Sequence, residues 1–352
     1  MNCRAKFFLP CILISSLLIS CWKKQGHEAT GPPLPNYSVS GRVFDSLTSQ
    51  PLPGARVTID DQKTVTDSLG GYRISGLLGG TNHSIDVTKE HFETYSTSIQ
   101  LGYADLDSFD IVLGKHLYFT DRFNGPAYEP NGLIWTGGIP WASEGWQRRM
   151  CVLSGAEGLS LVKYFDSPGS FPEKGHYTTP YGLTATEEGG THYLWVSVAY
   201  EAASPRLYKM AVKPDTTLST EARYDTPESA TNSGVHVLLD DLTYDGTHIW
   251  SCSSSEGKIY KHRSDMSVIQ SFDPQVAQPS GIAWDGGQFW LSTLGSNRLY
   301  LLNAESLEPT GYYVIQEEPV TGLSYRDGHL WACKHGSAGS IVSSWFYKYR
   351  PE

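Results

Sequence analysis

The chain has 352 residues, which leaves room for two or three domains. Its formal net charge of −10, without a compensating basic run, argues against a general nucleic-acid-binding protein. Charged residues make up 18%, aromatic residues 12%, and there are 35 glycines, a composition typical of a turn-rich β protein rather than a helical or disordered one.

The first 20 residues have the layout of a secretory signal peptide. Arg4 and Lys6 precede an apolar stretch, 7–19, that is too short for a membrane span. The segment ends in the sequence LISC at 18–21, which resembles the bacterial lipobox. That resemblance implies that Cys21 becomes the lipidated first residue of the mature chain, which anchors it in a membrane. An ordinary cleaved signal, in which Cys21 has no role, is the alternative.

The residues that follow Cys21 indicate a destination and a spacer. Trp22 and Lys23 come next, with no Asp, which resembles the sorting of Gram-negative lipoproteins to the outer membrane. Residues 21–36 are rich in Lys, Gly and Pro and predict a flexible tether. We therefore expect an exported outer-membrane lipoprotein, with the periplasmic or surface-facing side left open.

Residues 37–114 predict a small β-sandwich. Apolar, strand-like runs alternate there with turn residues. The runs are 38–44, 55–60, 71–74, 83–89 and 109–113.

Three motifs within this segment resemble the carboxypeptidase regulatory-like family. They are VSGRV at 39–43, PLPGARV at 51–57 and TDSLGGYRI at 66–74. The resemblance implies an Ig-type, transthyretin-like fold and a non-catalytic spacer or adhesion module. In it, Gly54 and Gly70 would turn the chain, and Tyr72 would lie in the core.

One phrase then occurs five times: a small residue, Leu or Ile, an aromatic residue, a Gly-rich turn and Trp. The clearest copies are 241–250, 281–290 and 322–331, and weaker copies begin at Gly132 and Gly182. A repeat that cannot bury its own apolar face must pack on its neighbours.

A second motif, an apolar residue followed by Tyr, trails most copies. It occurs at 207–208, 259–260, 299–300 and 346–347. Each unit then supplies three strands and a fourth leading to the next copy, which is the pattern of a β-propeller blade. We predict that 115–352 form a five-bladed propeller, which strand 116–123 closes by completing the last blade. Six blades would require another copy hidden between 206 and 240.

The recurring residues of the phrase are interpreted as structural. Seven tryptophans recur where packing recurs, so we expect core and not a sugar-binding stripe: Trp135, Trp141, Trp195, Trp250, Trp284, Trp290 and Trp331. His192, His248 and His329 fall in turns of different blades. Cys151, Cys252 and Cys333 form no CxxC pair, and we interpret them as small buried residues.

Candidate binding residues come from loops that enter the first strand or leave the second strand of each blade. These loops share one face around the central channel. The face carries Asn131, Glu144, Trp146, Tyr181, Glu201, Asp240, Ser254, Glu256, Ser280, Asn297, Thr321, Lys334 and His335.

The loop at 144–149 is chemically the most mixed on this face. Trp146 fits no repeat position and could stack on a ring, and Arg148 and Arg149 could pair with an anionic ligand. A merely solvated loop is the alternative. The pair Asp240 and Asp241 could ligate a cation or cap a turn.

The repeat style resembles the broad NHL, gluconolactonase-like, streptogramin-lyase-like and glutaminyl-cyclase-like propellers. For the metal-dependent lactonases, this resemblance implies Asn131, Glu144 and Asp240 as ligands of Ca²⁺ or another divalent cation. For the lyases it implies His335 as the catalytic histidine. We predict a non-catalytic protein that binds a protein or glycan and no cofactor, with a cation-dependent hydrolase or lyase as the alternative.

Overall fold

The computed structural model describes residues 36–125, 129–155, 158–170, 175–200, 204–316, 319–334 and 344–351. All regular elements in these ranges are β-strands, so the predicted all-β class is confirmed. No helix suited to crossing a membrane occurs in them. Cys21 lies outside the described residues.

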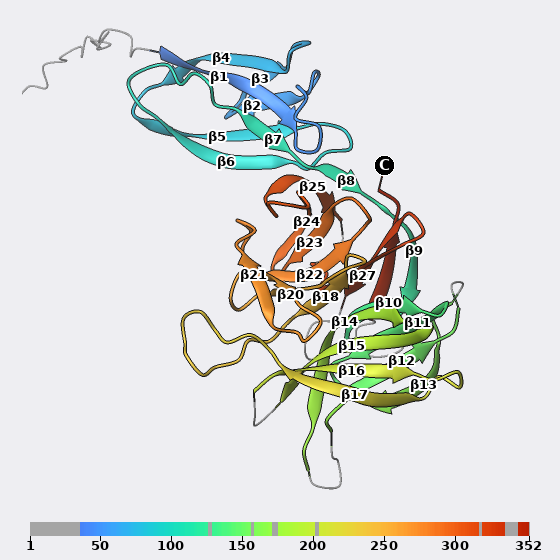
Figure 1. Ribbon diagram of the computed structural model, residues 1–352. Coiled ribbons are helices and arrows are strands. Elements are labelled where there is room, and N and C mark those ends of the chain that lie inside the picture. Colours follow the sequence, from blue (N-terminus) through green and yellow to red (C-terminus); the bar gives the residue numbers. More distant parts are fainter. Residues whose placement is uncertain are drawn as a thin grey trace, which may run out of the picture.

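The N-terminal unit is a sandwich of two sheets (Figure 1). In the first, β1 pairs antiparallel with β4 and parallel with β7. Its strands are β1 (Asn36–Asp45), β4 (Gly71–Leu78) and β7 (Ile111–Leu113). The second sheet has the order β3-β2-β5-β6. Its strands are β2 (Arg56–Ile59), β3 (Gln62–Val65), β5 (Thr81–Thr88) and β6 (Tyr95–Leu101).

Period-two alternation directs one side of each strand into the sandwich core. In β5, His83, Ile85 and Val87 are buried while their neighbours are exposed. Strands β3 and β6 were not predicted because their sequences, QKTV and YSTSIQL, are mostly polar and mostly exposed. The roles expected for the glycines and Tyr72 are confirmed, since Gly54 and Gly70 have φ of 72° and 73° and Tyr72 is buried.

The second unit consists of five sheets, four with four strands and one with five, arranged as the blades of a propeller (Figure 1). The first blade has β10 (Pro130–Thr136), β11 (Ile139–Glu144), β12 (Arg149–Leu153) and β13 (Leu161–Asp166). The second has β14 (Thr178–Glu188), β15 (Thr191–Tyr200), β16 (Arg206–Val212) and β17 (Leu218–Asp225). The third has β18 (Asp241–Tyr244), β19 (Ile249–Ser253), β20 (Lys258–His262) and β21 (Val268–Phe272).

The fourth blade has β22 (Pro279–Trp284), β23 (Phe289–Thr293), β24 (Ser296–Leu302) and β25 (Pro309–Ile315). The fifth has β26 (Gly322–Arg326), β27 (His329–Lys334), β28 (Trp345–Tyr349) and β9 (Phe119–Asn124). Five blades, not six, are present, because the stretch 206–240 holds the last two strands of the second blade and a loop.

The segment 116–123, expected to be one strand, is divided between two blades. β8 (Lys115–Leu117) pairs parallel with β25 as an additional edge of the fourth blade. β9 pairs antiparallel with β28 and supplies the outer strand of the fifth blade. The start and the end of the propeller sequence therefore meet in one sheet, which leaves no open gap in the ring.

The repeated tryptophan forms the core of each blade. In every blade its ring lies against an aromatic residue of the outer strand, at centroid distances of 5.7 to 6.1 Å. The pairs are Trp141–Phe165, Trp195–Tyr224, Trp250–Phe272, Trp290–Tyr313 and Trp331–Phe123. These five tryptophans are buried, which confirms them as core, whereas Trp135 and Trp284 of the predicted seven are partly buried and pack against the core.

The innermost strands approach so closely that the first residue of the phrase is nearly always glycine. Gly132, Gly182, Gly281 and Gly322 occupy this position in four blades. A Cβ on Gly182 would lie 2.4 Å from Asp241 Cα, and a Cβ on Gly322 would lie 2.1 Å from the Asn131 carbonyl oxygen. In the third blade the equivalent residue is Asp241.

Asp241 is neither a turn cap nor exposed to a cation at the mouth; it is fully buried in β18. Its Oδ2 accepts hydrogen bonds from the backbone N–H groups of Ile282 in β22 and Leu323 in β26, both at 2.9 Å. A carboxylate that reaches two other inner strands must lie at the propeller axis. The Asp241 side chain therefore links three inner strands near the axis.

Candidate functional site

The candidate site is the rim of the channel mouth, where β10 and β14 begin and β11 turns into β12. Trp146 lies on this turn and is 66% exposed, the only exposed tryptophan in the part of the chain that the structure describes. The turn is anchored to the segment before β10, because Gly145 N–H donates a hydrogen bond to the Glu129 carbonyl oxygen at 2.8 Å. The exposed indole is therefore presented by an anchored segment.

The side chain of Glu144 stabilises the same turn. Its side chain is 1% exposed, and both carboxylate oxygens accept the Gln147 N–H, at 3.1 and 3.0 Å. Arg149 Nε lies 3.4 Å from Glu144 Oε2, which makes an ion pair without a well-formed hydrogen bond. Burial raises the pKa of Glu144, although the N–H of Gln147 and the charge of Arg149 favour the ionised form. Glu144 acts as a structural support and is shielded from solvent.

The two arginines of the loop point to different places. Arg148 has a φ of 57°, and its guanidinium lies 5.1 Å from the ring centroid of Tyr177, which is 39% exposed. Arg149 lies over Tyr164 of the outer strand β13, at 4.9 Å. Arg148 and Tyr177 therefore belong to the rim with Trp146, whereas Arg149 stabilises the blade.

The mouth beside this aromatic group is acidic. Burial raises the pKa of Tyr181, and the nearby charges of Asp240 and Glu129 raise it further. The pKa of Asp240 is itself raised by burial, although Asp240 Oδ2 accepts the Ser254 N–H at 2.6 Å. Three acceptor groups, those of Glu129, Tyr181 and Asp240, thus gather where the first three blades meet.

The residues proposed as cation ligands are already engaged in local structure. Asn131 Nδ2 donates to the Pro180 carbonyl at 2.9 Å, which ties the first blade to the second. Glu144 and Asp240 accept backbone N–H groups of their own blades. In the described ranges, no three His, Cys, Asp or Glu side chains gather in a way that could hold a metal ion.

Other predicted face residues do not converge with this group. Asn297 is exposed on the fourth blade and donates to the Ile315 carbonyl at 3.0 Å. Glu256 holds the long loop before β18 by accepting the Ser229 hydroxyl at 2.7 Å. Lys334 ends β27 and is half-buried. His335 and Glu201 lie outside the described residues.

The sequence prediction missed two residues of the rim. Glu129 directly precedes Pro130, and Tyr177 lies four residues before Tyr181, so both flank the start of a repeat without belonging to it. Their position just ahead of the first strand of a blade was the available signal. The three buried thiols, Cys151, Cys252 and Cys333, are free, as expected.

A comparison with protein families identifies the sandwich. Residues 38–114 match the family described as Carboxypeptidase regulatory-like domain, so the sandwich is a domain of that kind. No curated protein matches the chain.

Similar solved structures cover the propeller. Glutaminyl cyclase of Myxococcus xanthus has 12% identity and a TM-score of 0.47, covering 67% of this chain and 98% of its own. The PQQ-bound aldose sugar dehydrogenase of Streptomyces coelicolor has 11% identity and a TM-score of 0.44, covering 66% and 97%. Regucalcin of Agrobacterium tumefaciens, described as a calcium-binding protein, has 10% identity and a TM-score of 0.43, covering 67% and 96%. At these identities the likeness concerns the fold alone, and it supports no inference about activity.

Proposed function

We propose that this protein is an exported, membrane-anchored binding protein whose propeller rim recognises a protein or glycan without chemically changing it. The observation that carries the proposal is Trp146, whose large apolar side chain is 66% exposed on a turn held by the buried Glu144. An exposed aromatic residue on a fixed support is suited to binding, because little conformational entropy is lost on contact.

The chemistry around Trp146 defines what the ligand should offer. Arg148 and Tyr177 extend the aromatic surface, and Trp, Tyr and Arg are the residues that most often dominate binding energy at interfaces. Glu129, Tyr181 and Asp240 add hydrogen-bond acceptors at the mouth. A ligand with a flat apolar face beside several hydroxyl, amide or ammonium donors would satisfy both parts.

We favour binding over the alternative of a cation-dependent hydrolase or lyase. Glu144 and Asp240 already accept backbone N–H groups, and releasing them for a cation would leave those donors buried or the turns unsupported. The lipid anchor is proposed from the lipobox-like sequence ending at Cys21, and the outer-membrane location from Trp22 and Lys23, which follow it.

The test is a binding screen with a matched pair of variants. The purified protein is applied to a glycan array and to a panel of outer-membrane and secreted proteins. We expect Trp146→Ala to weaken binding of the selected ligand at least about tenfold, because a central interface aromatic residue is removed.

Tyr103→Ala is the control, since Tyr103 is 79% exposed on the sandwich, far from the rim in sequence and fold. It should bind like the unmodified protein. Equal affinity of Trp146→Ala and the unmodified protein for every ligand found would refute the rim assignment. Conversion of the bound ligand to a new product, detected by mass spectrometry, would contradict the non-catalytic role.

A further inference from the structure

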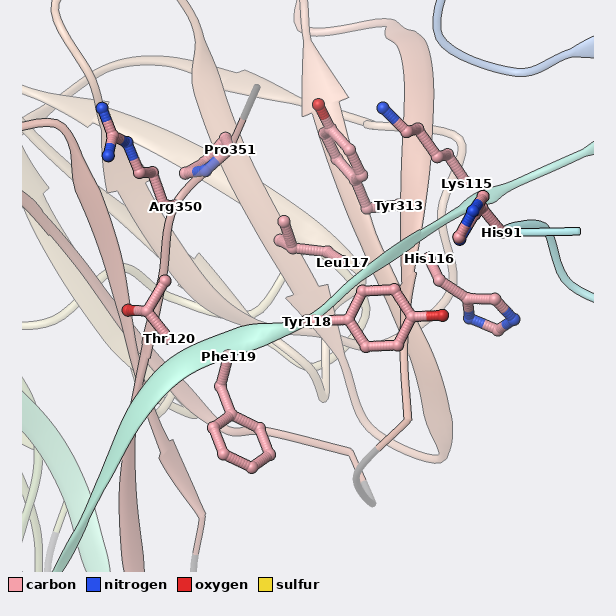
Figure 2. Close-up of a pocket in the computed structure, with 10 residues that line it drawn as sticks. All are labelled: His91, Lys115, His116, Leu117, Tyr118, Phe119, Thr120, Tyr313, Arg350 and Pro351. Carbon is pink, nitrogen blue, oxygen red and sulfur yellow. The ribbon is translucent and has the colours of Figure 1, made fainter.

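A cavity of about 850 Å³ lies at the junction of the sandwich and the propeller, away from the rim (Figure 2). The connecting segment Lys115–Thr120 forms one wall. His91 of the sandwich, Tyr313 of β25, and Arg350 and Pro351 after β28 complete the lining. Both domains and the C-terminal segment therefore contribute to it.

The connecting segment is held in a fixed position, so the cavity is preformed. β8 pairs with β25 in parallel, with Lys115 opposite Tyr313. Glu93 of the sandwich accepts hydrogen bonds from Gly114 N–H at 2.9 Å and from Tyr312 Oη at 2.6 Å, and it pairs with Arg298 at 3.0 Å.

The contact at Gly114 leaves no room for a side chain. A Cβ at that position would lie 2.3 Å from the Tyr312 ring, so the linker passes in direct contact with the fourth blade. The side chains of the cavity wall are therefore positioned by the docking of the two domains and do not depend on a ligand for their arrangement.

The cavity is basic although the chain as a whole has a charge of −10. Among the described residues that line it, His91, Lys115, His116 and Arg350 are basic, and none carries a carboxylate. No ion pair to Arg350 occurs within the described part of the chain, and His116 Nδ1 is buried there without a hydrogen-bond partner. His91 Nε2 lies 3.7 Å from Glu90 Oε1, so the positive charge that favours an anionic ligand is chiefly that of Arg350.

An aromatic ring lies between the basic groups. Tyr118 is 49% exposed and Phe119 is 36% exposed, although both belong to a segment that packs against the propeller. Figure 2 shows Arg350 at one end of the cavity, His116 and Lys115 at the other, and the Tyr118 ring beside the strand between them. The Phe119 ring points to the other side of the strand, where it packs on Tyr347 at a centroid distance of 5.5 Å. An apolar surface is thus available beside the charged groups.

We propose that this cavity binds a small molecule that carries an oxyanion, either a carboxylate or a phosphate, on an aromatic or other flat apolar ring. The planar guanidinium of Arg350 is suited to bidentate contact with such an oxyanion. Tyr118, which lies between Arg350 and the other end of the cavity, supplies the surface on which the ring stacks. This site is independent of the rim and does not depend on the function proposed for it.

The test is isothermal titration of the intact protein with four probes at low salt. Phenyl phosphate and benzoate contain both parts of the proposed ligand, whereas inorganic phosphate contains only the anion and phenol only the ring. We expect at least one of the two complete probes to bind with a Kd near or below about 1 mM, and each partial probe about tenfold more weakly. The ranking of phenyl phosphate against benzoate distinguishes phosphate from carboxylate.

Two variants locate the binding. Arg350→Gln, at an exposed position, should weaken the better complete probe about tenfold, and Tyr118→Ala should weaken it several-fold. Arg263→Gln, an exposed arginine in the turn between β20 and β21, is the control and should leave binding unchanged. Thermal unfolding of each variant, followed by circular dichroism, verifies that it is folded. Failure of both complete probes to bind at about 10 mM, or equal binding by Arg350→Gln and the unmodified protein, would overturn the proposal.

Discussion

Asp241 is the residue on which the centre of the propeller depends. Four blades place glycine at the ring position, and the third places a carboxylate there that reaches across the axis. The four glycines place no side chain between the inner strands, and the side chain of Asp241 occupies the space that they leave. The N–H groups of Ile282 and Leu323 would have no acceptor without it, and a buried unpaired N–H costs about 1–3 kcal/mol.

We therefore expect Asp241→Gly, which restores the common ring residue, to lower the free energy of unfolding by about 3 kcal/mol or more. Two N–H groups lose their acceptor and an empty space appears on the axis. Urea denaturation gives the comparison. Unchanged stability of Asp241→Gly would show that the carboxylate does not hold the inner strands together.

The same carboxyl group makes the stability of the fold depend on pH, in a direction that follows from its pKa. Burial raises the pKa of Asp241 well above its ordinary value, despite the nearby backbone N–H groups. Such a group stabilises the folded state fully when the pH is below the pKa that the group has in the unfolded chain. This contribution to the free energy of unfolding is lost as the pH rises through the pKa that the group has in the folded chain. Asp241→Asn, which cannot titrate, should lack that part of the decrease, as measured by urea denaturation from pH 4 upward.

At the scale of strands, closure of the ring depends on β9. Its Phe123 packs on Trp331 at 5.7 Å, which reproduces the pairing of tryptophan and outer-strand aromatic residue seen in the other four blades. A strand from the start of the propeller therefore completes the packing of its last blade. Such closure joins the two ends of the propeller through long-range contacts.

We expect Phe123→Ala to lower the free energy of unfolding by about 2 kcal/mol, since the Trp331 ring loses its partner. Asn124→Ala, at the exposed neighbouring position whose side chain points to the other face of the strand, should change it by less than about 0.5 kcal/mol. Differential scanning calorimetry measures both. Equal melting of the two variants would contradict closure through this aromatic pair.

The parts of this architecture that could be predicted are those encoded locally. The phrase that ends in Trp specifies two strands and their turn within ten residues, so all five blades were found. Strands β3 and β6 were missed because polar, outward-facing strands carry no apolar alternation. Asp241 was misread because its role depends on strands 41 and 82 residues away.

The rim was predicted in part for the same reason. Trp146 was recognised because it interrupts the repeat, and Asp240 and Tyr181 because they precede a first strand. Glu129 and Tyr177 were missed because they lie outside the repeated phrase, although each directly precedes the first strand of a blade. Glu144 has the residue type of a cation ligand, but its burial under the turn, which sequence could not reveal, makes it a support.

For the whole molecule, the sandwich and the propeller are joined by more than the chain. Ser46 Oγ donates to the Tyr312 carbonyl at 2.7 Å, and a Cβ on Gly311 would lie 2.5 Å from the Ser46 carbonyl oxygen. Together with the Glu93 contacts, these interactions favour movement of the two domains as one body. The sandwich would then fix the direction in which the rim faces, relative to the N-terminal segment.

The proposed anchor belongs to this scale. We expect Cys21→Ser to release the protein from the membrane into the soluble fraction, because the lipid attachment site is lost. Cys11→Ser, the same substitution at a cysteine outside the LISC motif, is the control and should leave the protein with the membranes. Immunoblots of fractionated cells measure the distribution, and continued sedimentation of Cys21→Ser with the membranes would show that the attachment does not depend on this residue.

Hydrogen–deuterium exchange of the protein, with and without the ligand found in the binding screen, tests most directly whether the rim is the binding surface. Binding at the rim predicts slower exchange in the turn between β11 and β12 and at the start of β14, with little change in the sandwich. Protection confined to the opposite face of the propeller, or to the sandwich, would contradict the assignment of the rim as the binding surface.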